Sequence, residues 1–168
     1  MKLQIRKGFE KVLGGASIWH DGKKSYGEEI VGLLNTVWSR LREMDVVQNG
    51  INMVVYDPDG TVFAGVEVSE ADAKRCGLES RKVKLGRYGY FKHVGPYSKL
   101  QETCVRMAEE LSTMGHPPTQ PIVEIYGHWT DDESKLETEI LHSIPDRAPN
   151  NTSDGIRQPA DGLPKPSR

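Results

Sequence analysis

The sequence predicts one α+β domain built from two β-α-β-β repeats. An apolar stripe with helical spacing occurs twice, two short strand-like segments follow each stripe, and the two halves align at a displacement of about seventy positions. One such repeat cannot cover its own sheet face. We therefore expect an antiparallel sheet that pools the strands of both repeats, with two helices on one face and a ligand groove on the other.

The first repeat covers about residues 1–70. A strand over 2–17 is interrupted by Gly14 and Gly15, where a bulge or a close backbone approach is expected. A helix follows, and Asn49-Gly50 marks its exit. Strands over 51–56 and 61–69 are joined by a turn whose proline and glycine suit its backbone angles. The helical stripe consists of Ile30, Leu33, Leu34, Val37, Trp38 and Leu41.

The second repeat covers about residues 80–146 in the same order. It contains a strand over 82–94, a helix over 98–114, and a hairpin of 121–129 with 135–144. The alignment of the repeats places Tyr126 on Tyr56 and Glu139 on Glu67. The predicted domain therefore spans 1–146. Its second helical stripe consists of Leu100, Cys104, Met107, Ala108 and Leu111.

Alternation along the strands predicts the two faces of the sheet. The face expected to pack under the helices carries Ile51, Met53, Val55, Val62, Ala64, Val66, Val68, Val123, Ile125, Leu136, Ile140 and Ile144. The opposite face carries Val54, Tyr56, Phe63, Glu67, Ile122, Tyr126, Glu139 and Leu141. A mixture of aromatic, aliphatic and acidic side chains is the composition expected of a small-molecule groove.

Composition excludes several classes of function. The 168 residues are 36% hydrophobic, with 22 basic and 24 acidic residues, so the basic footprint of a nucleic-acid binder is missing. No apolar run could span a membrane, and the first residues alternate like a strand, which predicts a cytoplasmic protein. Five of the ten prolines follow Ile144, so a disordered tail is predicted over 147–168. The cysteines and histidines lack metal-ligand spacing, and no metal or cofactor is predicted.

Three motifs in the second repeat resemble those of a known family. They are His93-Val94-Gly95-Pro96-Tyr97, then Glu124-Ile125-Tyr126, then Leu136 to Ile140, read as L-E-T-E-I. In that order they resemble the GyrI-like effector-binding domains, which are also the ligand-sensing part of AraC-type and MerR-type multidrug regulators and have a SOUL-like fold. The first repeat departs from the pattern, with Trp19-His20-Asp21-Gly22 where the other repeat has its G-P-Y element.

The resemblance implies a groove between the repeats on the face away from the helices. It also implies a ligand role for Glu139, with the ring of Tyr126 beside it. Ligands of the family are flat, apolar and often cationic, and a carboxylate among ring faces suits them. Glu139 as a solvated strand acid, Tyr97 and Tyr126 as rim packing, and Trp19 as a lid or a plug remain open alternatives. Trp129 lies in the second hairpin loop, where an exposed indole would have little structural reason, and it is therefore a candidate ligand-binding residue.

Two functions follow as hypotheses. The first is a stand-alone protein that captures or senses a small amphiphilic or aromatic molecule, because no helix-turn-helix precedes the first strand. The alternative is a GyrI-like hydrolase of cyclopropane-bearing natural products, using Glu139 and Tyr126, so the residues leave open whether the protein is an enzyme. A separate protein partner and haem binding through His20 or His128 rank below these. No direct contact with nucleic acid or membrane is expected.

Overall fold

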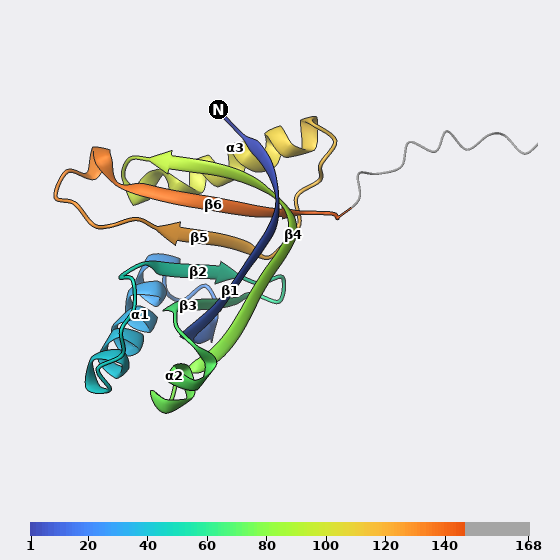
Figure 1. The fold of residues 1–168 in the computed structure, drawn as a ribbon. Helices are drawn as coiled ribbons and strands as arrows, with labels where there is room; N and C mark the ends of the chain where they lie inside the picture. Colours follow the sequence, from blue (N-terminus) through green and yellow to red (C-terminus); the bar gives the residue numbers. More distant parts are fainter. Residues whose placement is uncertain (147–168) are drawn as a thin grey trace, which may run out of the picture.

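Six antiparallel strands and three α-helices make up the fold. The computed structural model describes residues 1–146 (Figure 1). In chain order the elements are β1 (Gln4–Trp19), α1 (Tyr26–Glu43), β2 (Asn52–Tyr56), β3 (Thr61–Glu67), α2 (Glu70–Arg75), β4 (Glu79–Val94), α3 (Leu100–Thr113), β5 (Ile122–Tyr126) and β6 (Glu137–Ile144). Short 3₁₀ turns at Tyr97–Lys99 and Glu133–Lys135 precede α3 and β6. The predicted mixed α+β fold is confirmed.

The sheet closes on itself in the strand order β1-β3-β2-β5-β6-β4, because β4 pairs back to β1. The β1–β4 ladder extends from Gln4 opposite Tyr90 to Gly15 opposite Glu79, and Figure 1 shows these two long strands side by side. Closure creates an inside and an outside. The inside is filled by one apolar cluster, made of Leu13, Met53, Val55, Phe63, Val83, Leu85, Tyr88, Tyr90, Val123 and Leu141.

Helix α1 packs on the outside of the barrel. Ser25 caps its first turn by accepting a hydrogen bond from the backbone N–H of Glu28, and Arg40 and Arg42 lie in the last turn, where positive charge suits the helix dipole. Ile30 packs against β2 and β3, and Val37 against Val66. Burying each such side chain contributes roughly 1.5–3 kcal/mol. The predicted stripe is therefore the face that holds α1 to the barrel.

Helix α3 packs on the outer surface of the other repeat. Leu100 and Met107 contact Ile140 of β6, with Phe91 and Cys104 at the edge of that cluster. Helix α2 is six residues long, is capped by the Ser69 side chain, and was not predicted from the sequence. A single turn and a half is too short to show a helical period, so its start signal alone was not enough.

Gly15 allows two strands to approach closely. A Cβ atom at this position would meet the backbone carbonyl of Ala64 and would lie 2.9 Å from Cε1 of Phe63. Gly14 and Gly15 stay within the regular β1–β3 ladder, opposite Val66 and Gly65. Of the two alternatives predicted for this pair, the structure therefore shows the close approach.

The predicted side of the sheet is right for the side chains of β3 and β6 and wrong for those of β2 and β5. Met53, Val55, Val123 and Ile125 lie inside the barrel and not under the helices. Tyr56 and Tyr126, which were expected on the opposite face, pack outside with the helices, as do Val54 and Ile122. Both strands carry apolar residues on both faces, so alternation cannot distinguish the two sides, and the hairpin register, which sets Val55 opposite Phe63, decides them.

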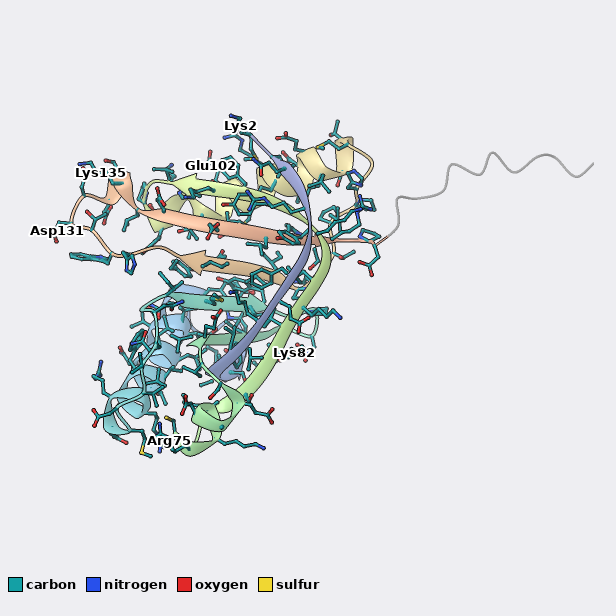
Figure 2. All side chains as sticks on the ribbon, in the orientation of Figure 1. Lys2, Arg75, Lys82, Glu102, Asp131 and Lys135 are labelled. Atoms are coloured by element: carbon teal, nitrogen blue, oxygen red, sulfur yellow. The ribbon has the colours of Figure 1, made fainter. Side chains whose placement is uncertain are left out.

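Charged side chains gather at the periphery, as the labelled Arg75, Lys82, Asp131 and Lys135 show in Figure 2. No helix within residues 1–146 is long and apolar enough to cross a membrane. The tail predicted to be disordered, 147–168, lies outside the described residues.

We expect Gly15→Ala to destabilise the protein by about 1–3 kcal/mol, the usual cost of adding volume to a packed site. Gly32→Ala is the matched control, because Gly32 is exposed in the middle of α1 with nothing near its missing Cβ. That change should stabilise the helix by up to about 1 kcal/mol. Urea unfolding of both variants measures the difference, and a Gly15→Ala variant as stable as wild type would contradict the close approach.

Candidate functional site

A buried carboxylate lies on the outer surface of the barrel, next to the side chains that pack with α1 and with α3. Glu124, in the middle of β5, is 5% exposed. Its Oε2 accepts a hydrogen bond from the hydroxyl of Tyr56 at 3.1 Å and a second from the hydroxyl of Tyr126. Tyr126 packs with the clusters of both α1 and α3. The carboxylate therefore lies where the two repeats meet.

Two further tyrosines continue from this centre to the surface. Tyr26, at the start of α1, meets Tyr56 edge to face with ring centroids 5.5 Å apart. Tyr97, in the turn before α3, meets Tyr126 edge to face at 5.2 Å. The outer rings are 46% and 38% exposed, whereas Glu124 is buried. We call Glu124, Tyr56, Tyr126, Tyr26 and Tyr97 the Glu124 cluster.

Each repeat adds a histidine next to the cluster. In the first repeat the ring of His20 stacks on Tyr26 at 3.8 Å, and its Nδ1 lies 2.8 Å from the buried carboxylate of Glu29. In the second repeat Nδ1 of His93 lies 2.9 Å from the hydroxyl of Thr103. These contacts hold the two chain segments that enter α1 and α3, and with them Tyr26 and Tyr97.

Burial dominates the electrostatics of the cluster. It raises the pKa of Glu124, and the hydrogen bonds from Tyr126 and Tyr56 only partly oppose that rise. Burial and the nearby carboxylate raise the pKa of both tyrosines, so both hydroxyls stay protonated and donate. Cys104 lies with its Sγ 4.0 Å from Oε1 of Glu124, and burial raises the pKa of this thiol to about 12. Near neutral pH the thiol is therefore not a nucleophile.

The two predicted acids, Glu139 and Glu67, lie on the inner side of the sheet. Glu139 is half-buried on β6, opposite Ile125 and Lys92 in its ladders, and accepts a hydrogen bond from the Tyr90 hydroxyl at 2.6 Å. Glu67 forms an ion pair with Lys11 at 2.8 Å. Phe63 is fully buried in the inner cluster. The structure therefore separates Glu139, Glu67 and Phe63 from Tyr56 and Tyr126, and a ligand role for each stays a prediction.

The two tryptophans predicted to contact a ligand are both exposed, one in each repeat. Trp19 ends β1 at 64% exposure, and its Nε1 donates to the carbonyl of Asp59 at 3.1 Å. Trp129 lies between β5 and β6 at 73% exposure, and its ligand role stays a prediction. Neither has a contact with Glu124 among the hydrogen bonds and ring pairs of residues 1–146. The same described part of the chain holds no group of His, Cys, Asp and Glu able to bind a metal ion.

Glu124 is the residue that sequence reasoning missed. Its motif, Glu124-Ile125-Tyr126, was recognised, but the family resemblance pointed to Glu139 of L-E-T-E-I as the ligand acid, and Tyr126 was placed on the wrong face. The sequence nevertheless contained a pattern that could have singled out Glu124. An acid in the middle of the apolar segment 122–126, two residues from a tyrosine on the same face, costs burial energy unless it has hydrogen-bonding partners.

A family model for the GyrI-like small molecule binding domain matches residues 19–144. The chain belongs to this family. The match includes the whole Glu124 cluster, which runs from Tyr26 to Tyr126, and it confirms the resemblance of the three motifs. The sequence matches none of the curated proteins with which it was compared.

Solved structures share the fold at low sequence identity. SAV2435 bound to tetraphenylphosphonium is 16% identical, with a TM-score of 0.59 over 86% of this chain and 94% of that one. The EcmrR C-terminal domain is 14% identical, with a TM-score of 0.58 over 86% and 99%. A hydrolase from Listeria innocua is 14% identical, with a TM-score of 0.53 over 86% and 92%.

We expect Glu124→Gln to gain stability over wild type as the pH rises. A raised pKa in the folded state means that folding favours the protonated acid, so its contribution is full below the unfolded value of about 4.3 and is lost as the pH rises through the folded value. Glutamine stays neutral and keeps an acceptor oxygen for both tyrosines. Melting temperatures between pH 4 and pH 8 measure the difference.

Glu137→Gln serves as the control, because Glu137 is an exposed acid on β6 that pairs with Lys92. Its melting temperature relative to wild type should change much less over the same range. A Glu124→Gln variant that loses stability relative to wild type as the pH rises would show that the ionised carboxylate stabilises the fold.

Proposed function

We propose that the protein captures or senses small aromatic cations, which bind at the Glu124 cluster with the positive charge beside Glu124. The observation that carries this proposal is a buried carboxylate whose two hydrogen-bonding tyrosines lead to exposed rings. The net charge of −2 and the lack of a basic stripe favour a binding protein that does not itself contact nucleic acid.

The chemistry of the cluster suits this ligand class. A cation that leaves water loses its hydration, and a desolvated carboxylate together with ring faces offsets that loss. The apolar parts of the ligand would replace contacts that Tyr26 and Tyr97 now make with the two inner tyrosines. Because both outer rings are partly exposed at the starts of helices, they can turn outward without opening the barrel core.

The comparisons support the proposal at the level of the family. The chain belongs to a small-molecule-binding family, and the similar structure of SAV2435 contains tetraphenylphosphonium, a cation with four aromatic rings. We use that compound as the probe. The ionised form of Glu124 is the one that attracts a cation, so affinity should fall as the pH drops below the raised pKa of this group.

We expect Glu124→Gln to weaken the binding of tetraphenylphosphonium by about 1–3 kcal/mol, roughly tenfold to over a hundredfold. The reason is the loss of a partly desolvated charge contact while the shape of the site is kept. Calorimetric titration at pH 8 provides the measurement. Glu137→Gln, an exposed acid on β6, should bind like wild type.

Glu139→Gln tests the role that the family resemblance assigned to the inner acid. We expect wild-type affinity for tetraphenylphosphonium, because Glu139 lies inside the barrel and Glu124 outside. Weakening by Glu139→Gln with no effect of Glu124→Gln would move the site to the inner face. No binding by wild type would contradict the proposed ligand class.

Hydrolysis is a second candidate, favoured by the hydrogen bonds between a carboxylate and two protonated phenols. Ionised Glu124 can take a proton from a water molecule, and Tyr126 can donate one to the carbon released when a strained ring opens. A spirocyclopropane natural product incubated with the protein should then gain one water, as mass spectrometry would show. Absence of turnover, or turnover that survives Glu124→Gln, would contradict this role.

A further inference from the structure

A cavity of about 340 Å³ lies between α3 and the last residues of β4. There β4 extends past the start of β1, because β1 begins with Gln4 opposite Tyr90 whereas β4 continues to Val94. Leu3 packs against the apolar cluster under α3, so the N-terminal end of the chain lies beside that helix (Figure 1). The cavity, which we call the α3–β4 cavity, shares no residue with the Glu124 cluster.

The helical wall of the α3–β4 cavity carries two cations and one acid. Lys99, Glu102 and Arg106 lie along one side of α3 and the turn before it. The Nζ atom of Lys99 lies 3.7 Å from Glu102, and both side chains are 65% exposed, so this ion pair contributes little free energy. Within residues 1–146, Arg106 forms neither an ion pair nor a side-chain hydrogen bond. Its guanidinium is therefore available to an anion in the cavity.

Two buried side chains, His93 and Thr103, form the inner end of the cavity. Nδ1 of His93 lies 2.9 Å from the Thr103 hydroxyl, and its Nε2 lies 3.3 Å from the carbonyl of Pro96. Because a carbonyl only accepts, a neutral ring carries its proton on Nε2 and accepts the Thr103 hydroxyl at Nδ1. Both side chains thus have hydrogen-bonding partners, and neither brings a negative charge toward the cavity.

The remaining lining of the cavity is apolar. Phe91 is half-buried, Val94 is 58% exposed and Met1 is 38% exposed. A small inorganic anion would leave these side chains in water, whereas a ligand with an apolar body would remove their surface from water. The cavity therefore suits a ligand with one anionic end and one apolar end.

The guanidinium of this cavity occurs in one repeat only. At the displacement of about seventy positions, Thr36 of α1 aligns with Arg106, whereas Val37 aligns with Met107. Val37 and Met107 are both fully buried, so the packing that holds each helix to the barrel is common to the two repeats. The fold does not require Arg106, and a substitution there tests the cavity without unfolding the protein.

We propose that the α3–β4 cavity is a second binding site, for small carboxylates with an apolar body. The carboxylate accepts two parallel hydrogen bonds from the guanidinium of Arg106, a geometry that suits this pair of groups. Lys99 supplies a second positive charge, and the apolar body of the ligand lies against Phe91 and Val94. Glu102 opposes binding, because it repels the carboxylate and competes for Lys99.

The experiment titrates benzoate into the full chain by calorimetry at pH 7, with neutral benzamide and the smaller acetate as matched probes. We expect saturable binding of benzoate by wild type, with benzamide and acetate bound at least about tenfold more weakly. Arg106→Gln should weaken benzoate binding by about tenfold or more, since it removes a charge-assisted contact. Glu102→Gln should strengthen it by about twofold to fivefold, the scale of an exposed charge interaction.

Controls separate this site from the Glu124 cluster. Arg40→Gln changes an exposed arginine in the last turn of α1 and should leave benzoate affinity unchanged. Glu124→Gln should also leave benzoate affinity unchanged, and Arg106→Gln should leave the affinity for tetraphenylphosphonium unchanged. The proposal is overturned if wild type does not bind benzoate, if Arg106→Gln binds it as tightly as wild type, if Glu102→Gln weakens it, or if benzamide binds equally well.

Discussion

The long antiparallel pairing of β1 with β4 is the constraint on which the rest of the structure depends. It joins the first strand of one repeat to the first strand of the other and closes six strands into a barrel. Without it, the six strands would form one open sheet, joined at its centre only by the pairing of β2 with β5. Closure makes every strand face an apolar interior on one side, and the helices then cover the outside of β2, β3 and β6.

The separation of an apolar interior from an outside covered by helices also explains why Glu124 is a candidate for function. Val54 lies directly opposite Glu124 in the β2–β5 ladder, so one repeat presents an aliphatic side chain where the other presents a carboxylate. The tyrosines, by contrast, occur in both repeats, as Tyr56 and Tyr126. Two similar halves thus share a single charge at their junction. A buried acid costs stability, and a buried acid with a raised pKa is a candidate for binding or chemistry.

Elements whose residues follow a clear helical or turn pattern were predicted correctly from the sequence. The stripe from Ile30 to Leu41 forms the packed face of α1, and the turn before β3 has Gly60 at φ of 90°. Val62 and Glu67 fall on the expected faces of β3. Interactions between residues close in sequence determine these features, so they can be predicted from the sequence itself.

The site required information that no local pattern contains. Val54 and Val55 are both fully buried, so the sequence could not tell which of them faces a helix, and the assignment of Tyr56 depended on that choice. Nor could it predict the α3–β4 cavity, which lies where β4 extends past the start of β1.

The sequence by itself determined the repeated elements, the helical stripes and the residue types available for binding a cation. The tertiary structure alone decided which side of the sheet each of them faces. The physical reason is that closing the barrel buries the central strands on both sides. Alternation distinguishes inside from outside only where one face is wet.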